Sequence, residues 1–167
     1  MNSWNAGLEV RVEEADKAHR MLIEATTEAA EAVERGDAAD VKILLEALHA
    51  NYGKHFAWEE ELMKESRFPD LKAHRDKHLA LLEEFGKITA ELAAKGLSPL
   101  FRLWFGSRLM GWLCFHIKGT DAPFYRHWLR WQEEQARVAE AKLAAEAKLG
   151  AQAEGTPERP GKSAAQS

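Results

Sequence analysis

Three short interruptions divide the stretch from residue 16 to residue 118 into four segments rich in Glu, Lys, Leu and Ala. They are Gly-Asp at 36–37, Arg-Phe-Pro-Asp at 67–70, and Gly96 followed by Ser98 and Pro99. Glycine commonly ends helices, whereas Asp, or Ser before Pro, commonly begins them. Helices are therefore predicted over four ranges, 16–35, 37–66, 70–95 and 98–118. Four helices of roughly 20 residues joined by short loops favour an all-α, up-down-up-down antiparallel four-helix bundle.

Ahead of the first helix, residues 1–15 are less regular and are predicted to form an N-terminal arm. The apolar side chains that would anchor this arm to the bundle are Trp4, Leu8, Val10 and Val12.

Beyond the fourth helix, the character of the sequence changes. Aromatic residues continue through 124–132, so this segment is expected to pack, whereas 133–149 is a good helix former with little to bury. Residues 150–167 have almost no hydrophobic side chains and are expected to be disordered. The sequence therefore predicts a bundle domain over 1–132 and a helical, then disordered, C-terminal extension over 133–167.

The composition narrows the class of protein. Charged residues make up 30% of the chain and hydrophobic residues 46%, with a net charge of −4, and no basic stripe that would bind nucleic acid is visible. The most apolar window, 97–117, contains Arg102 and Arg108, so no membrane span is expected. A single cysteine, Cys114, and the lack of a signal-peptide pattern favour a cytoplasmic protein.

Metal-binding side chains are distributed over all four predicted helices. In chain order the candidate ligands are His19, then His55 and Glu59, then His74 and His78, and finally His116 and Asp121. On the second and third helices the two donors are four residues apart, which places both on one helical face. A single His-x-x-x-Glu pair would be weak evidence, but one or two donors on every helix indicate a shared site in the bundle core.

Five imidazoles and two carboxylates exceed the four to six ligands of a single transition-metal ion and suit two ions. If both carboxylates bridge, together with an oxide or hydroxide, one ion becomes six-coordinate and the other five-coordinate. One position then stays open for a small exogenous ligand.

Imidazole and carboxylate donors are compatible with iron, zinc, copper or manganese. No HExxH motif occurs, and Glu46-x-x-His49 is a single copy of a motif that ferritin-like sites use twice. Carboxylate-bridged pairs in helical bundles favour iron or manganese. Because neutral imidazoles outnumber carboxylates, ferrous iron should be favoured over high-valent iron, and dioxygen binding over dioxygen activation.

Several sequence blocks resemble motifs of the hemerythrin family, in particular its single-domain bacterial members. They are DKAH at 16–19, HFAWEE at 55–60 with Met63, HRDKH at 74–78, WLCFHI at 112–117 and HIKGTD at 116–121. The blocks occur in family order, and the resemblance extends from about Trp4 to Asp121.

The resemblance implies an oxo- or hydroxo-bridged pair of non-haem iron ions that binds dioxygen reversibly. One iron would be held by His74, His78 and His116 and the other by His19 and His55, with Glu59 and Asp121 bridging. Dioxygen would bind to the two-histidine iron, in a pocket lined by Leu22, Phe56, Trp112, Leu113 and Ile117. An apolar lid of this kind would exclude water and anions and slow oxidation to the inactive diferric form.

The chain departs from the bacterial members at two positions. Ala18 stands where they commonly have Gln, which removes a hydrogen-bonding side chain next to the site, and Arg11 stands where Gly is common.

The pair of His116 and Asp121 raises a geometric question. Five residues of α-helix leave these side chains about 140° apart. Both can face the site only if the helix loosens locally, as in a π-bulge, near Gly119 and Pro123.

Other polar residues near these motifs are expected to have ordinary roles. Glu60 is expected to be solvated, and His49 and His127 are expected to have surface or packing roles.

The leading functional hypothesis is an oxygen-binding protein, not an enzyme, acting as a carrier, store or delivery protein. One alternative is an oxygen or redox sensor that acts through residues 122–167, by a protein partner or by self-association. Another is an enzyme that consumes peroxide or nitric oxide, which would need a polar group near the open metal position. Iron storage is disfavoured, because nothing in the sequence suggests a cage.

Overall fold

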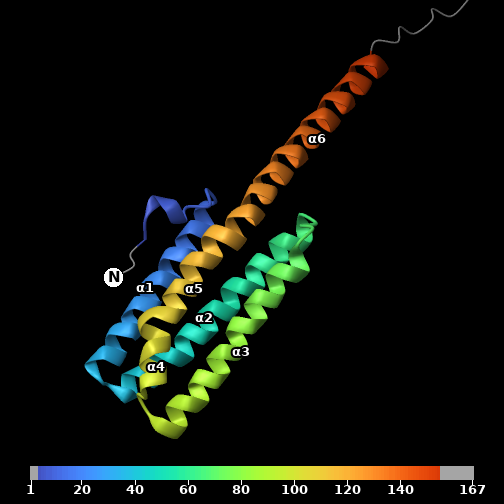
Figure 1. Ribbon diagram of the computed structural model, residues 1–167. Helices are drawn as coiled ribbons and strands as arrows, with labels where there is room; N and C mark the ends of the chain where they lie inside the picture. Colours follow the sequence, from blue (N-terminus) through green and yellow to red (C-terminus); the bar gives the residue numbers. More distant parts are fainter. Residues whose placement is uncertain (1–3, 155–167) are drawn as a thin grey trace, which may run out of the picture. The chain divides into compact units, whose positions relative to one another are not determined.

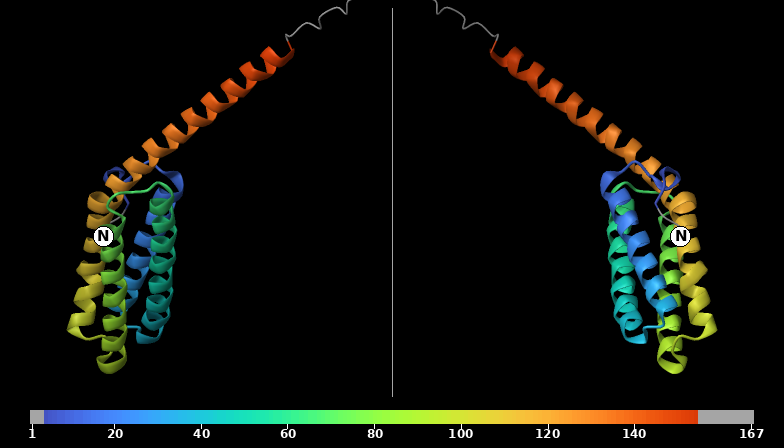
Figure 2. Two further views of the ribbon diagram at one scale, coloured as in Figure 1. Left: turned by 90° about the vertical axis from the view of Figure 1, so that its right-hand side faces the viewer. Right: turned by 90° about the vertical axis from the view of Figure 1, so that its left-hand side faces the viewer.

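The computed structural model describes residues 4–154, which form helices and no strand. Three long helices, α1 (Glu13–Arg35), α2 (Ala38–Glu65) and α3 (Leu71–Lys95), lead into a fourth helical rod. This rod consists of α4 (Pro99–Leu103), η2 (Trp104–Arg108), α5 (Leu109–His116), η3 (Ile117–Asp121) and α6 (Ala122–Glu154). Successive helices of the bundle run in opposite directions (Figures 1 and 2), which confirms the predicted all-α bundle.

The residues predicted to end and begin helices lie in the loops between these helices. Gly36 ends α1 with φ +78°, and the Asp37 carboxylate accepts the N–H of Asp40 at the start of α2. Gly96 follows α3 with φ +63°. The Ser98 hydroxyl accepts the N–H of Phe101 at the start of α4. At these two loops the glycine that ends one helix and the side chain that caps the next lie within two residues of each other, so the connections are short.

The two halves of the bundle have different interiors. Around the loop between α1 and α2 the core is aromatic and aliphatic, with Leu45, Leu48, Phe85, Phe101 and Phe105 almost fully buried. Toward the loop between α2 and α3 the interior is built around buried histidines and carboxylates. The apolar half therefore supplies packing stability, and the polar half requires partners for its buried groups.

The N-terminal arm includes a short 3₁₀ turn, η1 (Ala6–Leu8). Of its four predicted anchors, Leu8 and Val10 are buried, while Trp4 and Val12 are only half-buried. Helix α1 begins at Glu13, slightly earlier than predicted, so the arm is shorter than the expected 1–15.

The prediction that the fourth helix ends near residue 118 is wrong, because the helix runs on into α6. Two π-helical segments, η2 and η3, interrupt the α-helical pattern without breaking the rod. Pro123 lies in the first turn of α6, directly after η3. Pro123 has no N–H to donate to the carbonyls of η3, and the wider π-helical turn accommodates its ring.

The described residues fall into two compact units that divide between Leu129 and Arg130. In the second unit, side chains 132–149 are exposed, and helix α6 continues to Glu154. Residues 150–154 are thus helical, contrary to the prediction of disorder, and the rest of that prediction, 155–167, lies outside the described residues. No helix within 4–154 is long and apolar enough to cross a membrane.

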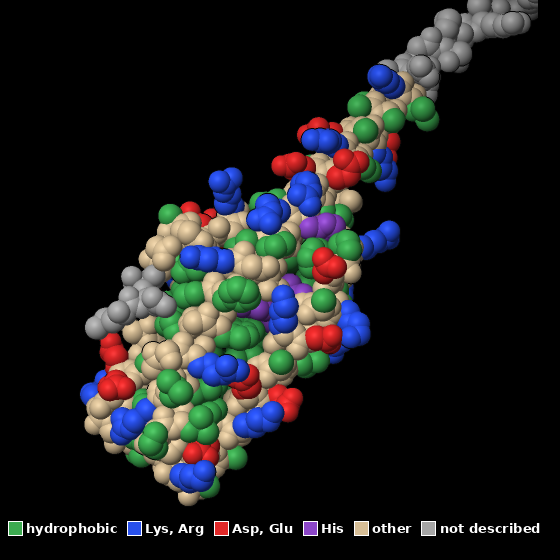
Figure 3. Space-filling view, in the orientation of Figure 1, with side chains coloured by type: hydrophobic (Ala, Val, Ile, Leu, Met, Phe, Trp, Pro, Cys, Tyr) green, Lys and Arg blue, Asp and Glu red, His purple; other side chains and the backbone are tan. Residues whose placement is uncertain are grey.

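On the face shown in Figure 3, acidic and basic side chains are interspersed over the bundle. This distribution agrees with the small net charge of −4.

Candidate metal centre

Helix α1 carries the first predicted ligand, His19, on its inward face. The imidazole is fully buried, and its Nε2 lies 3.3 Å from Oδ2 of Asp121. Less than one turn earlier, the Asp16 carboxylate accepts hydrogen bonds from the N–H groups of Val10 (2.8 Å) and Arg11 (3.1 Å). Asp16 therefore ties the arm to the first turn of α1 and fixes the helical turn from which His19 projects.

Helix α2 contributes His55 and Glu59 from one face, as their spacing predicts. The His55 ring lies 4.9 Å from the His19 ring, between centroids. Glu59 is fully buried, and its Oε2 lies 3.2 Å from Nε2 of His74 and 3.3 Å from Nε2 of His78. The Glu59 carboxylate thus lies between helices α2 and α3.

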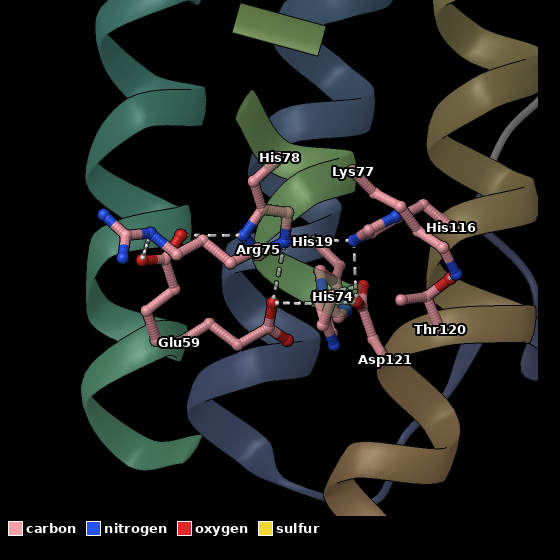
Figure 4. Close-up of polar contacts among 10 residues, drawn as sticks. His19, Glu59, His74, Arg75, Lys77, His78, His116, Thr120 and Asp121 are labelled. Atoms are coloured by element: carbon pink, nitrogen blue, oxygen red, sulfur yellow. Dashed lines mark hydrogen bonds and ion pairs between the residues drawn. The ribbon is translucent and has the colours of Figure 1, made fainter. Parts of the chain in front are cut away.

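Helices α3 and α5 contribute a cluster of three imidazoles. The ring centroids of His74 and His78 are 4.6 Å apart, and each lies 5.0 Å from that of His116. The Nε2 atoms of His78 and His116 are 3.1 Å apart. Figure 4 shows His19, Glu59 and this cluster converging on one region from different helices.

Asp121 reaches the same region because η3 is π-helical. The N–H of Ala122 donates to the carbonyl of Ile117, five residues back, which widens the turn. The wider turn brings Oδ1 of Asp121 to 3.0 Å from Nε2 of His116 and 3.1 Å from Nε2 of His74. The local loosening that the sequence required is therefore present, and the fully α-helical separation of about 140° does not apply.

The donor atoms form two overlapping groups, within each of which they lie no more than 4.8 Å apart. The first group consists of Glu59, His74, His78, His116 and Asp121, and the second of His19, His55, Glu59 and Asp121. The two carboxylates belong to both groups. This division matches two neighbouring ion positions with shared carboxylate bridges.

The hydrogen bonding of these donors tests whether a metal fits. Among the described residues, nine buried side-chain atoms have no hydrogen-bond partner, and eight of them belong to His19, His55, Glu59, His74 and Asp121. These atoms approach one another to 3.1–3.3 Å without the alignment of hydrogen bonds. Unpaired buried polar groups are costly, so this arrangement suits ligands that share a central cation.

The protonation states also suit a cation. Burial lowers the pKa of His55 to about 4 and also lowers the pKa of His116, which favours the neutral, metal-binding imidazole. Burial opposes protonation of His74 too, but the close Asp121 and Glu59 carboxylates outweigh it and raise the pKa of His74 to about 9. A high proton affinity between two carboxylates shows that the cluster favours positive charge.

The carboxylates themselves remain ionised. Burial and the charge of Asp121 would raise the pKa of Glu59, but the neighbouring His74 and His78 outweigh them and lower it to about 2. For Asp121, contacts with His116, His19 and His74 outweigh burial in the same way and hold the pKa well below its usual value.

The residues predicted to line an oxygen pocket are all in the core or at its edge. Leu22, Leu113 and Ile117 are buried, whereas Trp112 is half-buried. The ring of Phe56 stacks on His78, with centroids 3.9 Å apart. Trp112 stacks on His116 at 4.3 Å. Phe56 and Trp112 therefore cover two members of the three-histidine cluster, and Phe56 also lies 6.0 Å from His55.

A groove of about 490 Å³ between α1 and α2 reaches the site from outside. Its lining includes Ala18, Leu22, His55 and Trp58. The short side chain of Ala18 leaves open space beside His55, whose Nδ1 has no hydrogen-bond partner.

The sequence analysis was wrong about Glu60, which is not simply solvated. Its side chain is only 14% exposed, and its Oε1 accepts a hydrogen bond from Nδ1 of His78 at 3.2 Å. Glu60 lies about 100° around the helix from Glu59. No sequence signal relates it to a histidine on another helix.

Tyr125 is a further polar residue at the site that the sequence analysis did not single out. Its hydroxyl is the ninth unpartnered buried atom, and its ring lies 6.2 Å from that of His19. Burial raises the pKa of this phenol, and the charges of Glu59 and Asp121 raise it further. Its position four residues after Asp121 is a signal that could have identified it, because that spacing keeps both on one helical face.

The two histidines outside the donor set, His49 and His127, have surface or packing roles, as predicted. His49 is exposed and stacks on Phe85 at 5.2 Å. His127 donates from Nε2 to the carbonyl of Ser66 at 2.8 Å and packs against Phe68.

Comparison with known proteins agrees with this geometry. The hemerythrin HHE cation-binding domain family matches residues 10–128, which extends the resemblance past Asp121 and includes Tyr125. The chain is similar to a bacteriohemerythrin of Stenotrophomonas maltophilia (strain R551-3), with 27% identity over 122 residues, 72% of this chain and 77% of the relative. It is also similar to a myohemerythrin of Theromyzon tessulatum, with 26% identity over 121 residues, 72% of this chain and 88% of the relative.

Proposed function

This chain belongs to the hemerythrin family, and on that basis we propose that it binds dioxygen reversibly at two non-haem iron ions, as an oxygen carrier, store or delivery protein. His74, His78 and His116 would hold one iron, His19 and His55 would hold the other, and Glu59 and Asp121 would bridge them.

The observation that carries the proposal is the pair of overlapping donor groups that share Glu59 and Asp121. A single-ion site would need neither the second group nor two shared carboxylates. Five imidazoles make the donor set only weakly anionic, which favours the ferrous state needed to bind dioxygen.

The side chains around the donors would protect the bound ions. When bound, the two ferrous ions would together supply two electrons to dioxygen. Leu22, Phe56, Leu113 and Ile117 are almost completely buried and present only hydrocarbon to the site. They would exclude water and anions and so oppose loss of the reduced state.

A second candidate function is consumption of peroxide, and the Tyr125 hydroxyl supports it. That reaction needs a proton-carrying group beside the ions, and Tyr125 is a buried neutral phenol whose hydroxyl is close to the carboxylate of Glu59. The apolar surroundings of the remaining site favour reversible binding over this alternative.

The deciding experiment is an oxygenation cycle on the iron-loaded protein. The protein is reduced without air, exposed to oxygen and then purged, while the visible spectrum is recorded. A coloured form that appears with oxygen and disappears on purging is expected. Immediate oxidation that purging does not reverse would exclude the carrier role and favour peroxide consumption.

A matched pair of variants on α2 ties the result to the site. His55→Gln removes a proposed ligand and should abolish the reversible coloured form. His49→Gln changes an exposed histidine on the same helix and should leave the spectrum unchanged. Equal behaviour of the two variants would contradict the ligand assignment.

A further inference from the structure

Glu60 and Arg75 form a chain of polar contacts that ends on one of the central histidines. Nδ1 of His78 donates to Oε1 of Glu60 at 3.2 Å, and Oε2 of Glu60 lies 3.3 Å from Nε of Arg75. Figure 4 shows His78 and Arg75 on the same helix, with dashed lines that link both to the intervening carboxylate. The Glu60 side chain is 14% exposed and that of Arg75 is 53% exposed, so the chain runs from the surface to the buried cluster.

The two nitrogens of His78 therefore have different environments. Nδ1 faces the carboxylate of Glu60, whereas Nε2 lies 3.3 Å from Oε2 of Glu59 and 3.1 Å from Nε2 of His116. A carboxylate that accepts the N–H of one ring nitrogen fixes the tautomer and leaves the other nitrogen free to bind a metal. In His78, Nδ1 is the nitrogen that donates to a carboxylate, and Nε2 is the nitrogen left to bind a metal.

His19 and His55, on the other side of the cluster, lack such a contact. Their Nδ1 atoms are buried without a hydrogen-bond partner. A hydrogen bond from an imidazole to a carboxylate makes the imidazole a stronger electron donor. The three-histidine side therefore has a source of electron density that these two histidines do not have.

We propose that Glu60 is a positioning residue for the metal centre, which orients His78 and increases its electron donation, and that Arg75 moderates this effect by sharing the Glu60 carboxylate. The inference rests on the proposed di-iron function and deepens it. It assigns a more electron-donating histidine, His78, to the three-histidine ion.

The proposal predicts effects of opposite sign at the two positions. Glu60→Gln removes the negative charge behind His78, so the oxidised centre loses stabilisation and its reduction potential should rise. Arg75→Gln removes the cation that shares this carboxylate, so the Glu60 charge acts more strongly on His78 and the potential should fall. A purely structural role would shift the potential in the same direction in both variants.

The test measures the reduction potential of the iron-loaded full-length chain by spectroelectrochemical titration, and cobalt(II) affinity of the metal-free chain by absorption. Glu60→Gln is expected to raise the potential and weaken cobalt binding about 10–100-fold. The matched controls are Glu61→Gln on α2, next to Lys64, and Lys72→Gln on α3, next to Asp76. Glu61→Gln removes a negative charge, as Glu60→Gln does, and Lys72→Gln removes a positive charge, as Arg75→Gln does, but both lie in exposed ion pairs. Both controls should leave the reduction potential and the cobalt affinity near the wild-type values.

The inference is overturned if Glu60→Gln behaves like Glu61→Gln, or if the Glu60 and Arg75 variants shift the potential in the same direction. Arg75 is half-exposed, so Arg75→Gln should fold even if Glu60→Gln does not. In that case, a reduction potential that does not fall in Arg75→Gln overturns the inference. A wild-type chain that does not take up two metal ions would instead refute the proposed function. The metal content of the wild-type chain is therefore measured before any variant is compared.

Discussion

Arg11 adopts a backbone conformation that is unfavourable for a residue with a side chain. Its φ of +64° is in the left-handed region, where a non-glycine residue costs roughly 1–2 kcal/mol. The N–H groups of Val10 and Arg11 both donate to Asp16, so the arm must turn sharply to reach this carboxylate. A glycine at this position would not meet this penalty, which gives a conformational reason for the Gly that the resemblance leads one to expect here.

Replacement of Arg11 by Gly should stabilise the protein by about 0.5–1 kcal/mol, because relief of strain exceeds the entropy that Gly adds to the unfolded chain. Urea unfolding of the metal-free protein measures the change. Glu9→Gly is the control, since Glu9 has an ordinary φ of −71° and the substitution should destabilise. Two changes of the same sign would contradict the strain argument.

At the scale of the element, the π-helical segment η3 decides the geometry of the site. It places His116 and Asp121 on one side of the rod although they are five positions apart in the sequence. A contact from α3 stabilises this segment, because Nζ of Lys77 donates to Oγ1 of Thr120 at 2.9 Å. Thr120 directly precedes Asp121, so this hydrogen bond fixes the backbone that carries the carboxylate.

Thr120→Val should therefore cost about 1 kcal/mol of stability and also weaken metal binding, because Val keeps the shape of Thr but cannot accept this hydrogen bond. Urea unfolding and cobalt(II) titration measure the two effects. Thr89→Val is the matched control on α3, where the hydroxyl bonds only to the Phe85 carbonyl of its own helix. Equal cobalt affinities of the two variants would contradict the role of the Lys77–Thr120 hydrogen bond in positioning Asp121.

At the scale of the whole molecule, the buried cluster links stability to pH. His55 has an ordinary pKa of 6.5 when unfolded and about 4 when folded, so its contribution to stability is present above 6.5 and is lost as pH falls toward 4. His74 shifts the other way, to about 9, so its contribution is present below 6.5 and is lost as pH rises through 9.

The metal-free protein should consequently be most stable near pH 6.5, with declines on both sides. Urea unfolding from pH 4.5 to pH 9 would record the profile. His74→Gln should remove the alkaline decline and leave the acid one. A wild-type stability that does not fall between pH 6.5 and pH 9 would contradict the raised pKa of His74.

The second unit provides another test at this scale. Side chains 132–149 are exposed, so they contribute little buried area to folding. A chain that ends at residue 132 should keep its free energy of unfolding within about 0.5 kcal/mol and its oxygen affinity unchanged. A large change in oxygen affinity would support the sensor alternative, which requires the extension to respond to the site.

The sequence by itself determined the elements and the chemistry of this protein. Glycine, proline and capping residues specify helix ends through local backbone energetics, so Gly36, Asp37, Gly96 and Ser98 marked the loops correctly. Histidines and carboxylates one turn apart share a helical face, so the spacing of the donors indicated a site in the bundle core.

The tertiary structure alone decided how those donors are arranged and supported. Because contacts between helices depend on packing between distant segments, no local pattern related Glu60 to His78 or Lys77 to Thr120. The continuation of the fourth helix past Pro123 was missed for a similar reason. The proline signal for a break is local, whereas the π-helical segment that accommodates it is needed to bring Asp121 to histidines of α1 and α3.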